Sequence, residues 1–171
     1  MKTLIWAIIF ILGTSICFAQ ETKQPESKNK QLAGFEWLTQ FEGNWATEYN
    51  GSMTSRSVGK KWIVNEISFQ KGVTSSVQTI GYDAKTKKFI GTWIDTSSSF
   101  LWQYSGSLDS SGKILILAAD GPDLNEPTKI RQFRDTYEFK SENEIAVVSQ
   151  MLNDKGQWKI FNKSKMTRKV K

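Results

Sequence analysis

Histidine is absent from this 171-residue chain, and cysteine occurs only once, as Cys17. Histidine is the usual general base at neutral pH and the commonest metal ligand, so its absence excludes a Ser-His-Asp triad. Together with the scarcity of cysteine, it also excludes the ordinary zinc sites and the usual proximal ligands of haem. A metal would need oxygen ligands, and we expect neither a metal nor any other cofactor.

Residues 1–19 have the features of a secretory signal peptide. Lys2 supplies the positive start, residues 4–12 are an apolar run, and Ala19 is a small residue at the expected cleavage point. The apolar run is shorter than the roughly 20 residues that cross a bilayer. We therefore expect cleavage after Ala19, export to the periplasm or the medium, and no membrane anchor in the mature protein.

Removal of this leader takes away the only cysteine, so the exported protein would hold no disulfide and would depend on its core for stability. Residues 20–30 are polar and charged without an apolar anchor, which predicts a disordered tether. Residues 31–171 would then form a single domain. The chain has a formal net charge of +6, but its charges are scattered rather than grouped into a basic stripe, and we expect no nucleic-acid partner.

From Trp45 onward, apolar residues recur with a period of two, and turn-forming residues interrupt the pattern at short intervals. No helical segment is long enough for a parallel crossover, so the strands should be antiparallel neighbours joined by hairpins. Closing such a meander into a barrel removes its edges. The near-helical spacing of apolar residues over 32–41 predicts a short helix at one end. The expected fold is all-β, an antiparallel up-and-down barrel of about ten strands with a short N-terminal helix.

The last strand shows the alternation most clearly. Lysines at positions 159, 163 and 165 fall on one of its faces together with Phe161, which marks that face as the one in contact with water. The predicted inner face carries Trp158, Ile160, Asn162, Ser164, Met166 and Arg168.

A short apolar helix leading into Gly43-Asn44-Trp45 resembles the N-terminal signature of lipocalins. In that signature the glycine permits a close turn and the tryptophan fills the floor of the barrel. Lipocalins also pack an arginine of a late strand over this tryptophan. The resemblance therefore implies that Arg168 packs on Trp45 through a cation–π contact.

Four further segments resemble a bacterial family of uncharacterised proteins, the domain of unknown function 1579 family. They have the sequences IGYD at 80–83, KFIGTWID at 88–95, GSLD at 106–109 and MTR at 166–168. The resemblance extends from roughly residue 35 to the C-terminus, the whole folded part. It implies a lipocalin-like (calycin-type) barrel and no assigned activity.

A barrel of about eight to ten strands is wide enough to hold one small ligand among its inward side chains. For any single aromatic residue, filling the barrel is the more frequent role, but the six tryptophans that follow the expected cleavage point together favour an aromatic-lined cavity. We therefore expect an exported protein that binds or carries a small apolar or amphipathic molecule. The candidate ligand-lining residues are Trp45, Tyr82, Trp93, Asp95, Phe100, Trp102, Tyr104 and Arg168, with Trp158 as a further aromatic candidate.

Asp95 ends a strand, and its carboxylate must reach water or find a partner, because an isolated buried charge costs several kcal/mol. Arg131, Arg134 and Arg168 are candidate partners. The functional interpretation of Asp95 is a polar anchor for a ligand head group. An ion pair or a turn contact at the strand end is the simpler interpretation.

Two other functions stay open. Glu66, on the same strand face as Trp62 and Val64, could act with Asp95 as the acid and base of a carboxylate-based hydrolase or isomerase. Bulky residues on both faces of several strands would also allow a closed barrel without a cavity that acts through its surface. The loop at 120–126 gathers carboxylates but lacks the ordered spacing of an EF-hand, so we interpret it as a polar turn.

Overall fold

The structure is a computed structural model that describes residues 34–69 and 73–169. The predicted signal peptide at 1–19 and the predicted tether at 20–30 lie outside the described residues. Within the part of the chain that is described, no helix has the length and apolar character needed to cross a bilayer.

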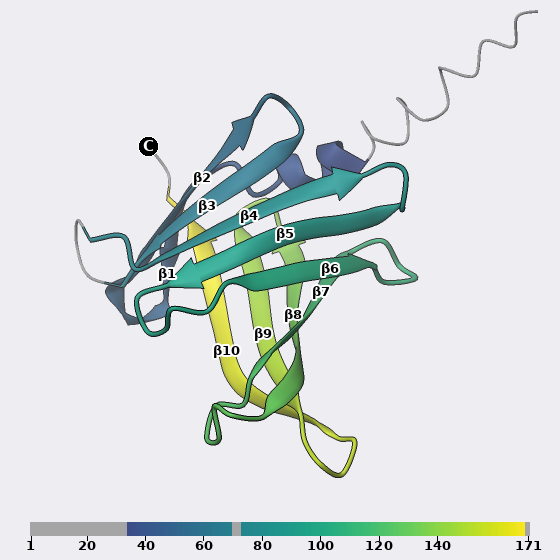
Figure 1. Cartoon of the computed structure of the whole chain (residues 1–171). Helices are drawn as coiled ribbons and strands as arrows, with labels where there is room; N and C mark the ends of the chain where they lie inside the picture. The colour runs from purple at the N-terminus through teal and green to yellow at the C-terminus, as the bar shows by residue number, and fades with distance from the viewer. Residues whose placement is uncertain (1–33, 70–72, 170–171) are drawn as a thin grey trace, which may run out of the picture.

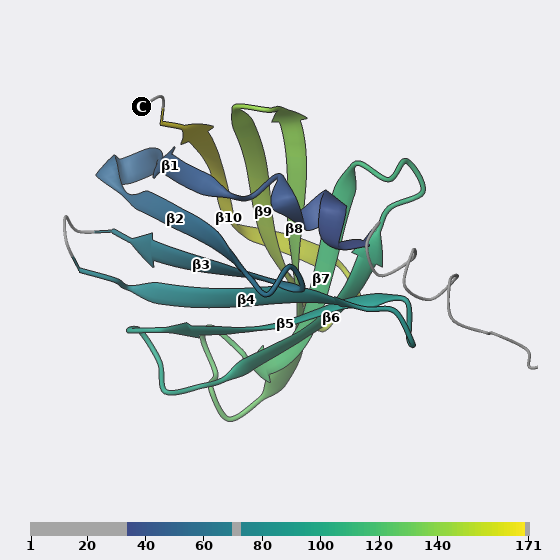
Figure 2. The same ribbon diagram turned by 90° about the horizontal axis from the view of Figure 1, so that it is seen from above.

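Within the described ranges, ten strands follow one another and close into a single antiparallel barrel (Figure 1). Each strand pairs with its neighbours in the sequence, and β1 pairs with β10 to complete the ring, which Figure 2 shows from above. This confirms the expected all-β, up-and-down, lipocalin-like barrel. The strands are β1 (Gly43–Thr47), β2 (Ser52–Val58), β3 (Trp62–Ser68), β4 (Ser76–Asp83), β5 (Lys88–Asp95), β6 (Trp102–Leu108), β7 (Ile114–Pro122), β8 (Ile130–Ser141), β9 (Glu144–Leu152) and β10 (Trp158–Arg168).

A short helix at residues 34–39 precedes β1, and a 3-10 turn, η1 (Glu48–Asn50), joins β1 to β2. The helix lies at the end of the barrel opposite the β7–β8 and β9–β10 loops (Figure 1). Trp37 fastens it there by donating its indole N–H to the carbonyl of Gly112 in the β6–β7 turn, at 3.0 Å. We call this end of the barrel the closed end and the opposite end the open end.

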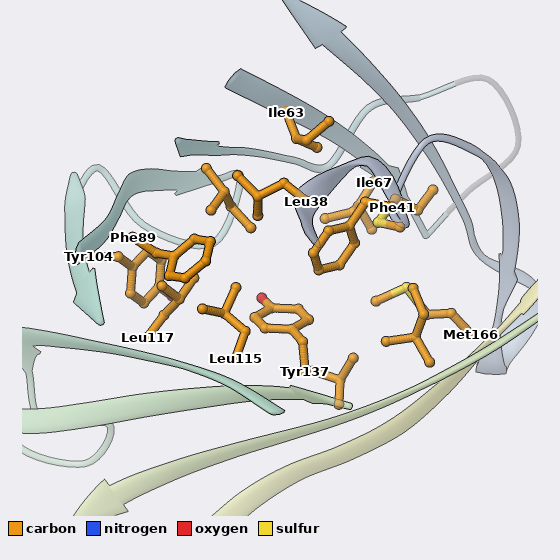
Figure 3. Close-up of a cluster of buried hydrophobic side chains, with 14 of the residues drawn as sticks. Leu38, Phe41, Ile63, Ile67, Phe89, Tyr104, Leu115, Leu117, Tyr137 and Met166 are labelled. Atoms are coloured by element: carbon orange, nitrogen blue, oxygen red, sulfur yellow. The ribbon is translucent and has the colours of Figure 1, made fainter. Parts of the chain in front are cut away.

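The hydrophobic core fills the closed end. Leu38, from the helix, and Phe41, just after it, are fully buried among inward side chains of the strands. Phe41 and Tyr137 lie at the centre of the cluster in Figure 3, with Leu115 and Met166 on either side. The Phe41 ring makes an edge-to-face contact with Tyr137, at 5.5 Å between centroids. Burying side chains of this size contributes roughly 1.5 to 3 kcal/mol each, which makes the closed end the main source of stability.

Arg168 packs on Trp45 at the closed end, as the lipocalin resemblance implies. We call this contact, together with the hydrogen bonds of Arg168, the lock. The two residues are opposite each other in the β1–β10 register, and the Arg168 guanidinium lies 4.0 Å above the fully buried Trp45 ring. The same guanidinium donates hydrogen bonds to the carbonyls of Gln40 and Glu142, at 2.9 and 2.8 Å, and also to that of Glu42. It thereby ties the β8–β9 turn to the segment before β1.

Gly43 is required beside this lock. Its φ is +121°, in the region that favours glycine, and a Cβ at this position would lie 2.7 Å from a terminal nitrogen of Arg168. The glycine of the Gly-Asn-Trp motif therefore provides both the backbone turn and the space for the arginine.

The predicted faces of the last strand are wrong in its first half. A β-bulge shifts the β9–β10 register between Ile160 and Asn162, and Phe161 is the extra residue. Trp158 consequently lies outside the cavity, with Arg134 over its ring at 4.2 Å. Phe161, expected on the water-facing side, borders the interior of the barrel instead. Beyond the bulge, Met166 and Arg168 point inward as predicted.

We predict that Arg168→Ala lowers the free energy of unfolding by about 2 to 3 kcal/mol, because it removes a cation–π contact and charged hydrogen bonds to backbone carbonyls. Urea denaturation followed by tryptophan fluorescence measures this change. Arg134→Ala is the matched control, since it removes a cation–π contact of similar geometry from the outer wall and should cost less than about 1 kcal/mol. Equal losses in the two variants would contradict the proposed lock.

Candidate functional site

A cavity of about 820 Å³ occupies the open half of the barrel. Its lining comes from the inward faces of the strands and from the loops that frame the open end, including residues 97–100 and 122–124. Cavities that hold small molecules in proteins usually measure about 300 to 1,000 Å³. The barrel is therefore not packed throughout, in contrast to the closed-barrel alternative considered above.

A chain of hydrogen bonds reaches this cavity from β3, and two of its three members, Gln78 and Tyr137, line the cavity. Asn65 donates to the side-chain oxygen of Gln78 at 3.0 Å, and Gln78 donates to the hydroxyl of Tyr137 at 2.8 Å. Asn65 and Gln78 are partners on β3 and β4, whereas Tyr137 comes from β8. The second polar atom of the Asn65 amide, its Oδ1, is buried and accepts no hydrogen bond from any described residue.

Four rings line one side of the cavity towards the open end, and we call them the aromatic collar: Phe100, Trp102, Phe133 and Phe161. Consecutive members contact each other edge to face, at centroid distances of 5.1, 4.8 and 5.8 Å. Such contacts fix the rings relative to one another. Gly121 makes room for Trp102, since a Cβ at this position would lie 2.0 Å from the indole ring.

Asp135 lies below the collar. It follows Phe133 by two residues on β8 and therefore lies about 7 Å further along the strand towards the closed end. Tyr104 donates its hydroxyl hydrogen to the carboxyl at 2.6 Å. Burial raises the pKa of Asp135 above its ordinary value, although hydrogen bonds from Ser149 and Tyr104 oppose this shift. Burial, followed by the Asp135 charge, also raises the pKa of Tyr104, so the phenol keeps its proton at neutral pH.

Asp95, at the mouth of the cavity, has a different environment. Its carboxylate accepts hydrogen bonds from the indole N–H of Trp93 at 2.8 Å and from the backbone N–H groups of Ser97 and Ser98 at 2.8 and 3.1 Å. Burial disfavours the charged form, but these bonds and that of the Ser97 hydroxyl outweigh it and lower the pKa of Asp95. Asp95 thus stabilises the turn after β5, as the simpler interpretation of its position anticipated.

The three arginines considered as partners of Asp95 are engaged elsewhere. Arg131 pairs with Asp123 at 2.8 Å and also with Asp154. Arg134 donates to Gln150 on the outer wall, and Arg168 belongs to the closed end. Among the described residues that line the cavity, none is lysine or arginine.

Five of the candidate residues named from the sequence line the cavity, and three do not. Those in the lining are Trp93, Asp95, Phe100, Trp102 and Tyr104. Trp45 and Arg168 form the lock of the closed end. Tyr82 packs against Phe89 at 5.0 Å and borders a separate depression that includes Lys61 and Ile90. Trp45, Tyr82 and Arg168 have the positions that alternation predicts. They lie in the closed half of the barrel, however, which the core and the Arg168–Trp45 contact occupy.

Asp135 and Phe161 line the cavity but were not identified from the sequence. Asp135 lies between Phe133 and Tyr137 in the period-two pattern of β8, so its placement among inward aromatic residues was a signal that could have revealed it. Phe161 could not have been found in this way, because the bulge reverses its expected direction.

The proposed acid–base pair of Glu66 and Asp95 does not form. Glu66 shares the face of its β4 partner Val77 and of the exposed Ile94, which is the outer face of the wall, and its side chain is 45% exposed. It lies 3.7 Å from Arg56 in a surface ion pair. Asp95 points to the inner face, so the barrel wall separates the two carboxylates.

The residues of the described ranges contain no group of three or more acidic side chains close enough to hold a metal ion. In the loop that gathers carboxylates, Asp123 accepts hydrogen bonds from the backbone N–H groups of Asn125 and Glu126, at 2.8 and 3.1 Å. Together with its ion pair to Arg131, these bonds account for the shape of this loop.

These features define a class of protein, a lipocalin-like, ten-stranded antiparallel barrel with a cavity at its open end. Comparison with known families makes the assignment more specific. The chain belongs to the family described as protein of unknown function (DUF1579), which it matches over residues 30–168. No curated protein matches it.

We predict that Asp135→Asn raises the free energy of unfolding at pH 7 by about 1 kcal/mol, because it removes a carboxyl whose charged form burial disfavours. The raised pKa means that the unfolded chain releases this proton first as the pH rises above 3.8, so wild-type stability falls with pH. The advantage of the variant should therefore be present at pH 7 and absent at pH 3.5. Denaturant titrations across this range measure it.

Asp95→Asn provides a control of opposite sign. The pKa of Asp95 is lowered by folding, so its stabilising contribution is present above pH 3.8 and is lost as the pH falls. This variant should be less stable than wild type at pH 7 and approach it on acidification. If the two variants showed the same pH dependence, our assignment of the two environments would be wrong.

Proposed function

We propose that this protein binds one small molecule with an apolar body in the open half of its barrel. The observation that carries this proposal is the cavity of about 820 Å³ behind the aromatic collar. Natural barrels of about this strand number hold single ligands in the same place. We further propose, from the leader at residues 1–19, that the protein acts after export.

The mouth of the cavity favours the entry of an apolar molecule. Phe69, Leu124 and Phe161 border the cavity and are 55, 51 and 48% exposed. Exposed apolar side chains gathered at one opening often mark a binding site. An apolar molecule that enters between these side chains leaves water for apolar contact before it reaches the rest of the collar. This burial of apolar surface is favourable.

Catalysis has less support than binding. Asp95, the carboxylate named first as a candidate acid or base, has both oxygens occupied by Trp93, Ser97 and Ser98. Glu66, its expected partner, lies on the other side of the wall. These hydrogen bonds lower the pKa of Asp95, which makes its carboxylate a weak base at neutral pH.

Ser164→Trp tests the proposal by filling the cavity. Ser164 lies beyond the bulge on the inner face of β10 and borders the cavity. We expect wild-type protein to bind the neutral apolar dye N-phenyl-1-naphthylamine with 1:1 stoichiometry, with energy transfer from tryptophan, and this variant to bind it at least tenfold more weakly.

Lys163→Trp is the matched control, because the adjacent Lys163 is exposed on the outer face of the same strand. It adds the same side chain without entering the cavity, so its affinity for the dye should stay within twofold of wild type. Absence of binding by wild type, or equal weakening in both variants, would contradict a ligand site inside the barrel.

A further inference from the structure

The cavity combines aromatic rings with a carboxyl group that has no cationic partner among the described residues. Asp135 accepts hydrogen bonds from Tyr104 and Ser149, both of which are uncharged. A carboxylate can accept about four hydrogen bonds, so Asp135, which borders the cavity, retains acceptor capacity. A partly buried carboxylate without a counter-charge loses part of its solvation, and a cationic ligand would compensate for that loss.

The charge of the lining differs in sign from that of the whole chain. The chain carries a formal net charge of +6, yet the described lining includes Glu48, Asp95, Asp123 and Asp135 and neither lysine nor arginine. Arg131, which lies near the mouth, is held by Asp123 and Asp154. An anionic head group, such as that of a fatty acid, would be desolvated in the cavity without a partner.

The aromatic collar suits a cation as well. Trp102 and Phe133 meet at 4.8 Å with an interplanar angle of 78°, and Asp135 follows one inward position below them. A cation is attracted to the faces of such rings, and proteins that recognise quaternary ammonium groups combine aromatic rings in this way. Rings and carboxyl together would bind a positive group more strongly than either alone.

We propose that the ligand of this cavity is an amphipathic organic cation, an amine or ammonium group on an apolar body, whose charge is received by Asp135 below the aromatic collar. This inference rests on the proposed function and adds the chemical class of the ligand. The apolar body lies among the rings of the open half, and the positive group reaches the carboxyl.

Four compounds with the same alkyl chain test the inference on wild-type protein. They are dodecylamine, dodecyltrimethylammonium, dodecan-1-ol and dodecanoate, each titrated below its micelle concentration and followed by tryptophan fluorescence and by displacement of N-phenyl-1-naphthylamine. We expect the two cations to bind at least tenfold more tightly than the alcohol, and the carboxylate to bind most weakly. Equal affinities, tightest binding of dodecanoate, or binding of none of the four would overturn the inference.

Binding of the dye distinguishes a failure of this inference from a failure of the proposed function. Protein that binds N-phenyl-1-naphthylamine but does not prefer the cations has a cavity for neutral molecules, so only the inference falls. Protein that binds neither the dye nor any of the four compounds contradicts the proposed function itself.

The variant Asp135→Asn tests whether Asp135 causes the preference for cations. We expect this variant to bind dodecan-1-ol within twofold of wild type, which also demonstrates an intact cavity, and to lose most of the tenfold preference for the cations. Glu66→Gln removes a carboxylate from the outer wall and should leave the preference unchanged. A preference that persists in Asp135→Asn would show that Asp135 does not receive the charge.

Discussion

The seam between β1 and β10 is the contact on which the rest of the barrel depends, because it turns an open sheet into a closed ring. The seam is short, with three register pairs between the strands. Arg168 reinforces it by lying over its register partner Trp45 and donating to backbone carbonyls on both sides. Without closure, the inward faces of ten strands would meet water, and neither the core nor the cavity could exist.

Closure divides the interior into two halves with different physical roles. The closed half is packed with apolar side chains around Phe41 and supplies stability. The open half keeps about 820 Å³ free and contains Asp135, whose raised pKa marks it as a destabilising residue at neutral pH. Tyr137, the last member of the hydrogen-bonded chain from Asn65, belongs both to the core and to the lining of the cavity. Stability gained in one half offsets the cost of an incompletely packed, partly polar site in the other.

Much of the site followed from alternation along single strands. Trp102 and Tyr104 are two residues apart on β6, and both line the cavity as expected. The exceptions have definite causes. Trp158 and Phe161 exchange places because a bulge adds one residue to β10, and alternation does not reveal a bulge. Asp135 was not predicted, because a charged residue inside a barrel is improbable without a partner. Its partner, Tyr104, is on a different strand, and the sequence does not show that the two residues meet.

The sequence by itself determined the class of the fold, since period-two alternation with frequent turns and no long helix permits little besides an antiparallel meander. It also determined the absence of histidine chemistry. Only the tertiary structure decided where the space lies, which carboxyls face it, and that Glu66 and Asp95 are on opposite sides of the wall. Bulges and packing across the barrel depend on residues far apart in the chain, and the periodicity of a single strand does not reveal them.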